Sequence, residues 1–265
     1  MNTNAHHRLE QRLSPRSPGR FDVVSRLHHF ALINYALPTE RLAPHIATER
    51  FEIAQFPIAG EPRAIISAVP FLDVDFTFPR IPGCPKWRFA QTNYRAYVID
   101  SVTGEHAVWF FGTALGHPIV HIPRQLWRIP WHQARYRLDC RYDAAARRYE
   151  RYRFDVASDW GEAAIALEDT GEPISLQPGF ASLDEMRLIL THPLDGYYRC
   201  LDGRLGSYSV WHELLEPTMG RAQELYFGVF ERLGLLSREE MAQPHSVFML
   251  PETTFQVVLP PRRLD

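Results

Sequence analysis

The sequence is almost devoid of lysine. Its 29 basic residues include a single lysine, Lys86, and all the others are arginine. A guanidinium group does not lose its proton in a protein, so arginine cannot form an imine with a carbonyl substrate. Any covalent chemistry through an amine side chain therefore depends on Lys86.

Cysteine is also scarce. Cys84, Cys140 and Cys200 are widely spaced and form no CxxC pair, which argues against a disulfide framework and against a zinc ribbon. This usage is typical of a protein of the reducing cytoplasm.

Signals of several other protein classes are missing. No run reaches the roughly 18 apolar residues that a membrane helix needs, and the first 20 residues hold four arginines and two prolines but no apolar run of a signal peptide. The chain has no Gly-rich phosphate loop, dinucleotide-binding fingerprint, GxSxG or HExxH motif. A formal net charge of -2 gives no general attraction to nucleic acid or to an anionic membrane. We therefore expect neither as a partner.

One histidine pair has metal-ligand spacing. His117 and His121 are four residues apart, but Pro118 disrupts the helix that would bring them together, and no carboxylate flanks them. We expect no metal site and no cofactor.

Short strands dominate the pattern. The 21 prolines divide the chain into segments rich in Val, Ile, Tyr, Phe and Trp, most of them with alternating polarity, as strands have. About twelve such strands with only a few helices predict a mainly β protein. Its large antiparallel sheet should curve and close into a barrel, because closure removes edges that would pair with other chains. Such a barrel is wide enough to hold a ligand.

Helical signals are limited to four segments, 38–46, 122–128, 182–191 and 222–235. The last places Leu225, Val229 and Phe230 on one helical face, and it should cover an edge or end of the sheet. No repeat or linker divides the chain. Residues 21–265 are therefore expected to form a single domain, and residues 1–20 a mobile N-terminal tail.

A row of polar side chains marks one strand. In the segment 93–99, alternation places Asn93, Arg95 and Tyr97 on one face. This face binds a ligand if it points into a barrel, and it belongs to a solvated strand if it points outward. The next segment, 106–112, with Trp109 at its centre, is apolar on both faces. A strand that is buried on both sides favours a central neighbour and hence an inward Arg95.

Three motifs carry a resemblance to a known family. Asn-x-Arg-x-Tyr-Val (93–98), Val-Trp-Phe-Phe (108–111) and, after a short helix, Ile-Pro-Trp-His-Gln-Ala-Arg (129–135) resemble the domain of unknown function 2071 family. This is a bacterial group in the acetoacetate decarboxylase-like superfamily. The likeness runs from about His28 to Trp211, and its specific motifs occupy residues 93–135. It implies a curved antiparallel sheet forming a cone-like barrel with a small ligand cavity, which agrees with the strand pattern.

The catalytic lysines of the superfamily are missing. In acetoacetate decarboxylases the short helix leads into Gly-Phe-Pro-Lys-Lys, whose first lysine forms the imine with substrate and whose second lowers the pKa of the first. The corresponding stretch here ends in Trp131 and His132, and Lys86 lies on a different segment. The resemblance therefore implies the fold without Schiff-base decarboxylation.

Several histidines are candidates for proton transfer. His132 titrates near neutrality and can act as a general acid or base in a cavity; the alternative is a core histidine with a satisfied backbone hydrogen bond. Alternation should send one of His28 and His29 inward, and one of His212 and Glu213 can reach the cavity in the same way.

An arginine- and tyrosine-rich tract covers residues 135–153. Cations interleaved with aromatic rings are found on nucleic-acid-binding surfaces. The same pattern is expected of a two-stranded hairpin with a solvated face and a turn at 143–146, and we favour the hairpin.

Three functional hypotheses follow. In the preferred one, the barrel interior binds a small organic molecule whose carboxylate or enolate pairs with Arg95. Such a protein is either a lyase or isomerase that acts on a small carbonyl acid without an imine, with His132 moving the proton, or a binding module without chemistry. A nucleic-acid-binding hairpin is a distant third, and a homo-oligomer is compatible with the sequence. The expected ligand-binding residues are Asn93, Arg95, Tyr97, Trp109 and Trp131.

Overall fold

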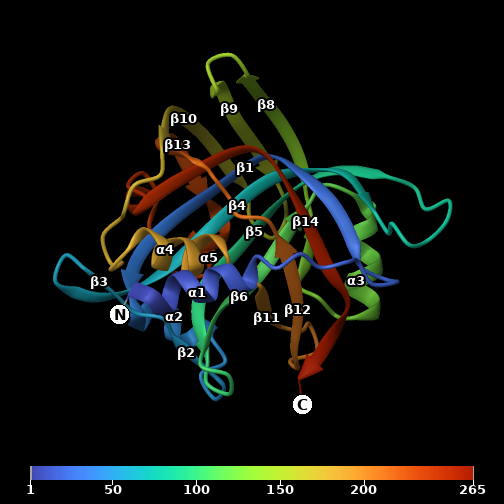
Figure 1. Cartoon of the computed structure of the whole chain (residues 1–265), viewed down its shortest axis with the longest axis horizontal. Coiled ribbons are helices and arrows are strands. Elements are labelled where there is room, and N and C mark those ends of the chain that lie inside the picture. The colour runs from blue at the N-terminus through green and yellow to red at the C-terminus, as the bar shows by residue number, and fades with distance from the viewer. Residues whose placement is uncertain (1, 265) are drawn as a thin grey trace.

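The computed structural model describes residues 2–264, and its centre is a seven-stranded barrel (Figure 1). The strands follow one another in the order β1, β4, β5, β6, β11, β12, β14, and β1 pairs with β14 to close the barrel. All these neighbours are antiparallel except β6 and β11. The predicted curved sheet that closes on itself is confirmed. The strands span Val23–Pro38 (β1), Glu61–Thr77 (β4), Trp87–Asp100 (β5), Glu105–Leu115 (β6), Asp195–Arg199 (β11), Leu205–His212 (β12) and Ser246–Leu264 (β14).

A second sheet layer covers one side of the barrel. It branches from β14 through β13 and continues with β10, β9 and β8. Tyr94 and Ala96 on the outer face of β5 pack in one apolar core with Phe154 and Phe227 of this layer. Strand β5 is therefore buried on its outer face as well as facing the barrel interior. The layer comprises Arg135–Asp143 (β8), Arg148–Ala157 (β9), Ala163–Pro173 (β10) and Thr218–Phe227 (β13). Three short strands outside this layer pair with strands of the barrel: Phe51–Ile53 (β2), Phe56–Ile58 (β3) and Trp131–Gln133 (β7).

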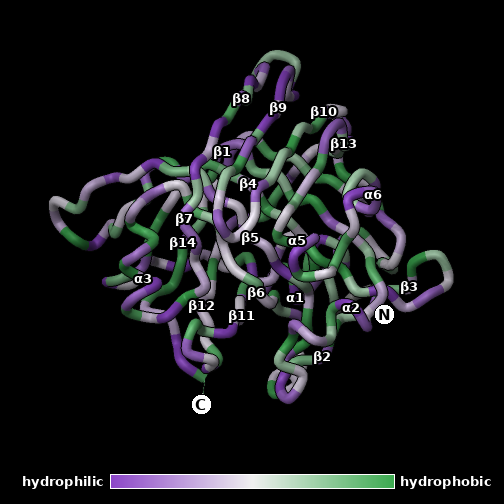
Figure 2. The backbone as a smooth tube through the Cα atoms, turned by 180° about the vertical axis from the view of Figure 1, so that it is seen from behind, coloured by the Kyte–Doolittle hydropathy of each residue, from purple (hydrophilic) through white to green (hydrophobic). Residues whose placement is uncertain are grey.

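The tract 135–153 forms the predicted hairpin. Strands β8 and β9 pair along their length and project from the body, with mainly hydrophilic residues along both strands (Figures 1 and 2). Arginines on the hairpin form ion pairs with carboxylates, including Arg141 with Glu150 and Arg151 with Asp139. Much of the positive charge of this tract is therefore balanced within the protein.

The helices are short and lie around the barrel. Residues 222–235 were expected to be helical, but β13 extends to Phe227, and the helix is confined to Gly228–Arg232 (α5). Leu225 and Phe227 alternate into the core while β13 pairs with β10, so sheet pairing overrides the helical pattern. No helix within residues 2–264 has the length and apolar character needed to cross a membrane. The other helical segments are Asn2–Arg12 (α1), Thr39–Leu42 (α2), Ala43–His45 (η1), Pro118–Val120 (η2), His121–Leu126 (α3), Leu183–Met186 (α4), Arg187–Thr191 (η3) and Arg238–Met241 (α6).

Part of the segment that was expected to be a mobile tail, residues 2–12, forms helix α1. Helix α1 lies against the body (Figure 1), where Leu9 is buried. Arg12 donates hydrogen bonds to the carbonyl oxygen of His192 at 2.8 Å and to the carboxylate of Glu105 at 2.9 Å. An apolar residue and an arginine on one helical face hold this segment in place, a pattern that its polar composition concealed.

A bulge in β6 sets which side chains enter the barrel. Cross-strand pairing with β5 skips Phe111, so Val108 and Phe110 before the bulge and Thr113 after it all face inward. Gly112 follows the bulge, and a Cβ atom there would lie 2.6 Å from the carbonyl oxygen of Pro130. Only glycine permits this close approach of the two backbones.

Candidate functional site

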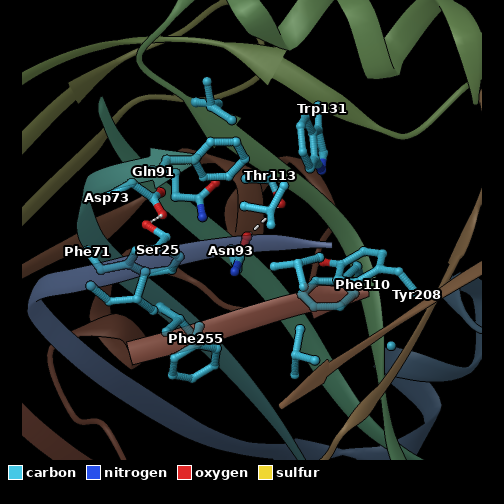
Figure 3. Close-up of a pocket in the computed structure, with 18 of the residues that line it drawn as sticks. Ser25, Phe71, Asp73, Gln91, Asn93, Phe110, Thr113, Trp131, Tyr208 and Phe255 are labelled. Atoms are coloured by element: carbon cyan, nitrogen blue, oxygen red, sulfur yellow. Dashed lines mark hydrogen bonds between the residues drawn. The ribbon is translucent and has the colours of Figure 1, made fainter. Parts of the chain in front are cut away.

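A largely apolar cavity occupies the barrel interior. Its volume is about 280 Å³, near the lower limit for small-molecule sites. Aromatic side chains form much of its wall, among them Phe71, Phe110, Trp131, Tyr208 and Phe255 (Figure 3). Ile122 of α3 also lines the cavity and is 56% exposed, so the cavity reaches solvent beside α3.

A row of polar side chains crosses this apolar wall along β5. Gln91, Asn93 and Arg95 alternate into the cavity, and the row spans roughly 13 Å at the rise of a strand. The Asn93 side-chain oxygen accepts a hydrogen bond of 2.6 Å from Thr113 Oγ1 (Figure 3), whereas the Gln91 amide has no side-chain hydrogen bond to any described residue. The row therefore presents amide groups to the cavity.

Arg95 has no counter-ion within residues 2–264. Its Nη2 donates to the carbonyl oxygen of Leu190 at 3.0 Å and to the Tyr97 hydroxyl at 3.3 Å. Its Nε is buried and has no hydrogen-bond partner in the described chain. A partly buried guanidinium without a carboxylate is costly, and an anion in the cavity would remove that cost.

Asp73 is a second ionisable group in the wall. It lies on β4, is 2% exposed and lines the cavity. Its Oδ1 accepts a hydrogen bond of 2.6 Å from Ser25 Oγ (Figure 3), whereas Oδ2 has no partner among residues 2–264. Burial raises the pKa of Asp73 to about 7, against the smaller opposing effect of the Ser25 hydrogen bond. Asp73 shares its strand face with Phe71, so alternation along β4 was the signal that could have identified it.

His212 is the histidine that reaches the cavity. Of the alternatives at residues 212 and 213, His212 lines the wall, and Glu213 lies exposed beyond the end of β12. The Nδ1 atom of His212 donates a hydrogen bond of 2.7 Å to the carbonyl oxygen of Glu213. Burial and then the neighbouring His192, whose ring centroid is 4.1 Å away, lower the pKa of His212 to about 3. The imidazole is therefore neutral at physiological pH.

Neither member of the His28 and His29 pair lines the cavity. His29 has a positive φ of 54° and lies 3.1 Å from the hydroxyl of Tyr149 in the second layer. The bulge in β1 at this point interrupts the alternation on which the prediction depended.

Three of the predicted site residues, Tyr97, Trp109 and His132, do not line the cavity. Trp109 and His132 lie outside it because each follows a residue that faces it. Val108 and Phe110 point inward, so Trp109 points outward and packs 5.6 Å from Phe51 between ring centroids. Trp131 lines the cavity, so His132 faces away and stacks on Trp160 at 4.1 Å.

The surroundings of His132 also disfavour the proposed role. Burial, followed by the nearby charges of Arg124 and Arg232, lowers its pKa to about 4. His132 is not placed to move a proton within the cavity.

Tyr97 supports the site rather than lining it. It is buried, and its hydroxyl donates to the carbonyl oxygen of Leu190 at 3.1 Å and accepts from Ser67 at 3.0 Å. The same carbonyl oxygen accepts from Arg95, so Tyr97 and the backbone of η3 fix the position of the guanidinium.

The cavity wall contains no lysine. Lys86 lies in the loop between β4 and β5, is 63% exposed, and has Nζ 3.8 Å from an oxygen of Asp75. The cavity therefore offers no amine side chain with which a substrate could form the imine known for the superfamily. Within residues 2–264, no group of three or more His, Cys, Asp or Glu side chains is arranged to hold a metal ion.

Fold and cavity together define a closed β-barrel protein with an interior cavity. The chain belongs to the domain of unknown function 2071 family, whose model, described as "Uncharacterized conserved protein", matches residues 25–253. No curated protein sequence gives a significant match.

Solved structures with the same fold are acetoacetate decarboxylase-like. The enduracididine biosynthesis enzyme MppR complexed with pyruvate aligns with a TM-score of 0.59 at 11% identity, over 94% of this chain and 92% of that chain. An acetoacetate decarboxylase-like enzyme from Sphingomonas wittichii RW1 gives 0.56 at 10% identity, over 96% and 97%. Acetoacetate decarboxylase from Legionella pneumophila subsp. pneumophila str. Philadelphia 1 gives 0.51 at 10% identity, over 96% and 94%. These likenesses establish the fold, and the resemblance found in the sequence is confirmed.

Proposed function

We propose that the barrel binds a small, largely apolar organic acid whose carboxylate pairs with Arg95. The observation that carries this proposal is the guanidinium in the cavity wall, with a buried, unpartnered Nε and no carboxylate from residues 2–264 to neutralise it. Arginine binds a carboxylate through two parallel hydrogen bonds that are stronger than neutral ones. An anionic group is therefore the ligand chemistry that completes this site.

The remainder of the ligand is expected to be apolar. Phe71, Phe110 and Phe255 present rings to the cavity (Figure 3), and each methylene group transferred from water into such a wall gains about 0.8 kcal/mol. One structural neighbour contains pyruvate. The present cavity should bind an acid with an aryl or alkyl body more tightly than an acid as small and polar as pyruvate.

Calorimetric titration with 4-phenylbutanoate and its primary amide tests the proposal. The two ligands share one apolar body, and only the acid carries the charge that Arg95 can pair with. Because a hydrogen bond to a charged group contributes about 1.5–3 kcal/mol, the acid should bind roughly ten- to a hundredfold more tightly. Equal affinities for the two ligands would count against an anion site.

A lyase or isomerase that works without an imine is the second candidate. His132 is outside the cavity, but Asp73 is inside it, and a pKa of about 7 suits a group that transfers a proton near neutral pH. A catalytic barrel would exchange the hydrogens beside the ketone of a bound keto acid with solvent deuterium, as followed by proton NMR. Binding without such exchange would leave the non-catalytic module as the function.

The cysteines and the ion pairs of the hairpin support proposals about the location and partners of the protein. Cys84, Cys140 and Cys200 are all unpaired thiols, which supports a reducing cytoplasm. The ion pairs on the β8–β9 hairpin reduce its attraction for phosphates. We therefore infer a small-molecule ligand and propose no nucleic-acid partner.

A further inference from the structure

We propose that Asp73 is a second recognition group of the cavity, which donates a hydrogen bond through Oδ2 to a ketone oxygen on the acid bound at Arg95. The substrate class is then an apolar keto acid, with its carboxylate at one end of the cavity and its carbonyl group toward the other. This inference rests on the proposed function, because it assumes that the carboxylate is bound at Arg95.

The hydrogen bonding around Asp73 leaves one oxygen for a ligand. Ser25 Oγ donates to Oδ1, so a proton on the carboxyl group is best placed on Oδ2. That oxygen is buried and has no acceptor or donor among residues 2–264. A buried acid with an unused O–H is costly unless something in the cavity accepts the hydrogen bond.

The two polar ends of the cavity are well separated. Asp73 is the cross-strand partner of Phe89, which packs with Val120 and Ile119 next to α3. Arg95 lies six residues further along β5, roughly 20 Å at the rise of a strand, and contacts η3 instead. A ligand with its carboxylate at Arg95 therefore presents its other end to Asp73.

The surroundings of Asp73 favour a neutral acid. Ser25 donates a hydrogen bond to Asp73, and the cross-strand partners of Asp73 are Leu27 of β1 and Phe89 of β5, none of which is charged. Burial then holds the pKa near 7, so the donor form is populated below neutrality and is lost as the pH rises.

Other ionisable groups in the wall do not change over the same pH range. The guanidinium of Arg95 remains charged. His212 stays neutral because its pKa is lowered to about 3, and burial raises the pKa of Tyr208 far above this range. A pH-dependent preference for a ketone would therefore report on Asp73.

The test compares a series of phenyl keto acids, in which the chain between carboxylate and ketone is lengthened until it covers the separation of Arg95 and Asp73, with the analogues in which the ketone is a methylene. Binding is measured by calorimetry at about pH 5.5 and about pH 8.5. In the wild type, the best-fitting ketone should bind about three- to tenfold more tightly than its methylene analogue at the lower pH. This preference should disappear at the higher pH as Asp73 loses its proton.

Two variants separate a hydrogen-bond donor from a merely structural residue. Asp73→Asn keeps Oδ1 for Ser25 and offers an amide N–H in place of the O–H, so its ketone preference should persist at both pH values. Asp73→Leu has no donor and should show no preference at either. If the leucine variant does not fold, the asparagine variant alone still shows whether residue 73 acts as a hydrogen-bond donor, because its ketone preference should then not depend on pH.

The outcomes also distinguish this inference from the proposed function. Methylene analogues that bind as well as the ketones, or a ketone preference in the wild type that survives at high pH, would overturn the role of Asp73 while acid binding at Arg95 stands. If no acid of either series binds in an Arg95-dependent manner, both proposals fall.

Discussion

Replacing Arg95 by glutamine is expected to weaken the binding of 4-phenylbutanoate by about 30-fold or more. Removing one partner of a desolvated, hydrogen-bonded charge pair costs about 2–5 kcal/mol, and each 1.4 kcal/mol is a tenfold change in affinity. Glutamine retains a donor for the carbonyl oxygen of Leu190, so the side-chain position can be kept while the charge is lost. Calorimetric titration of the purified variant measures the effect.

The fold should tolerate this substitution. Arg95 has no counter-ion within residues 2–264, and removing an uncompensated, partly buried charge does not cost an ion pair. The free energy of unfolding of Arg95→Gln should therefore be equal to or above that of the wild type. Arg141→Gln is the matched control, because Arg141 is exposed on the hairpin and pairs with Glu150. An Arg141→Gln variant that lost binding as Arg95→Gln does would show that the effect is not specific to the cavity.

The two tryptophans of the predicted site are expected to respond in opposite ways. Trp109→Ala should lower the free energy of unfolding by about 3–5 kcal/mol, as truncation of a large core side chain does, because Trp109 is fully buried against Phe51 outside the cavity. Trp131→Ala removes part of the cavity wall and should mainly reduce the affinity for aryl acids. Urea unfolding and calorimetry, applied to both variants, measure the two effects.

Phe substitutions provide the controls. Trp109→Phe keeps much of the apolar volume and should recover most of the lost stability, and Trp131→Phe should recover most of the lost affinity. A Trp109→Ala variant that is as stable as the wild type but no longer binds acid would show that Trp109 contributes to the ligand site, and would contradict its position outside the cavity.

The fold was predictable because it depends on pattern rather than on detail. Many short alternating strands indicated closure into a barrel, and the motifs around Arg95 indicated the superfamily. The alternation of Asn93, Arg95 and Tyr97 also predicted one shared face; Asn93 and Arg95 line the cavity, and Tyr97 is buried without lining it. These features are local, and residues two apart on a strand remain on one face wherever the strand is placed.

The identity of the cavity face could not be predicted, because the barrel strands are covered on both sides. The second sheet layer buries the outer face of β5 and β6, so Trp109 reads as an inward residue as readily as Phe110 does. The bulge at Phe111 and the short parallel strand β7 then decide that Trp131 faces the cavity and His132 does not. Bulges depend on long-range packing, which a period of two does not reveal.

Asp73 shows a different limit of sequence reasoning. Its chemical importance comes from burial and from an oxygen without a partner, and both are properties of the closed barrel. A single aspartate between Leu72 and Val74 carries no motif. Its position on the same strand face as Phe71 was visible, but its environment was not.

The most direct measurement of the central claim is a thermodynamic cycle. The binding free energies of 4-phenylbutanoate and its primary amide are measured by calorimetry with the wild type and with Arg95→Gln. If the carboxylate pairs with Arg95, the preference for the acid over the amide should shrink by about 2 kcal/mol or more in the variant. An unchanged preference, with both ligands weakened equally or not at all, would contradict the pairing and with it the proposed anion site.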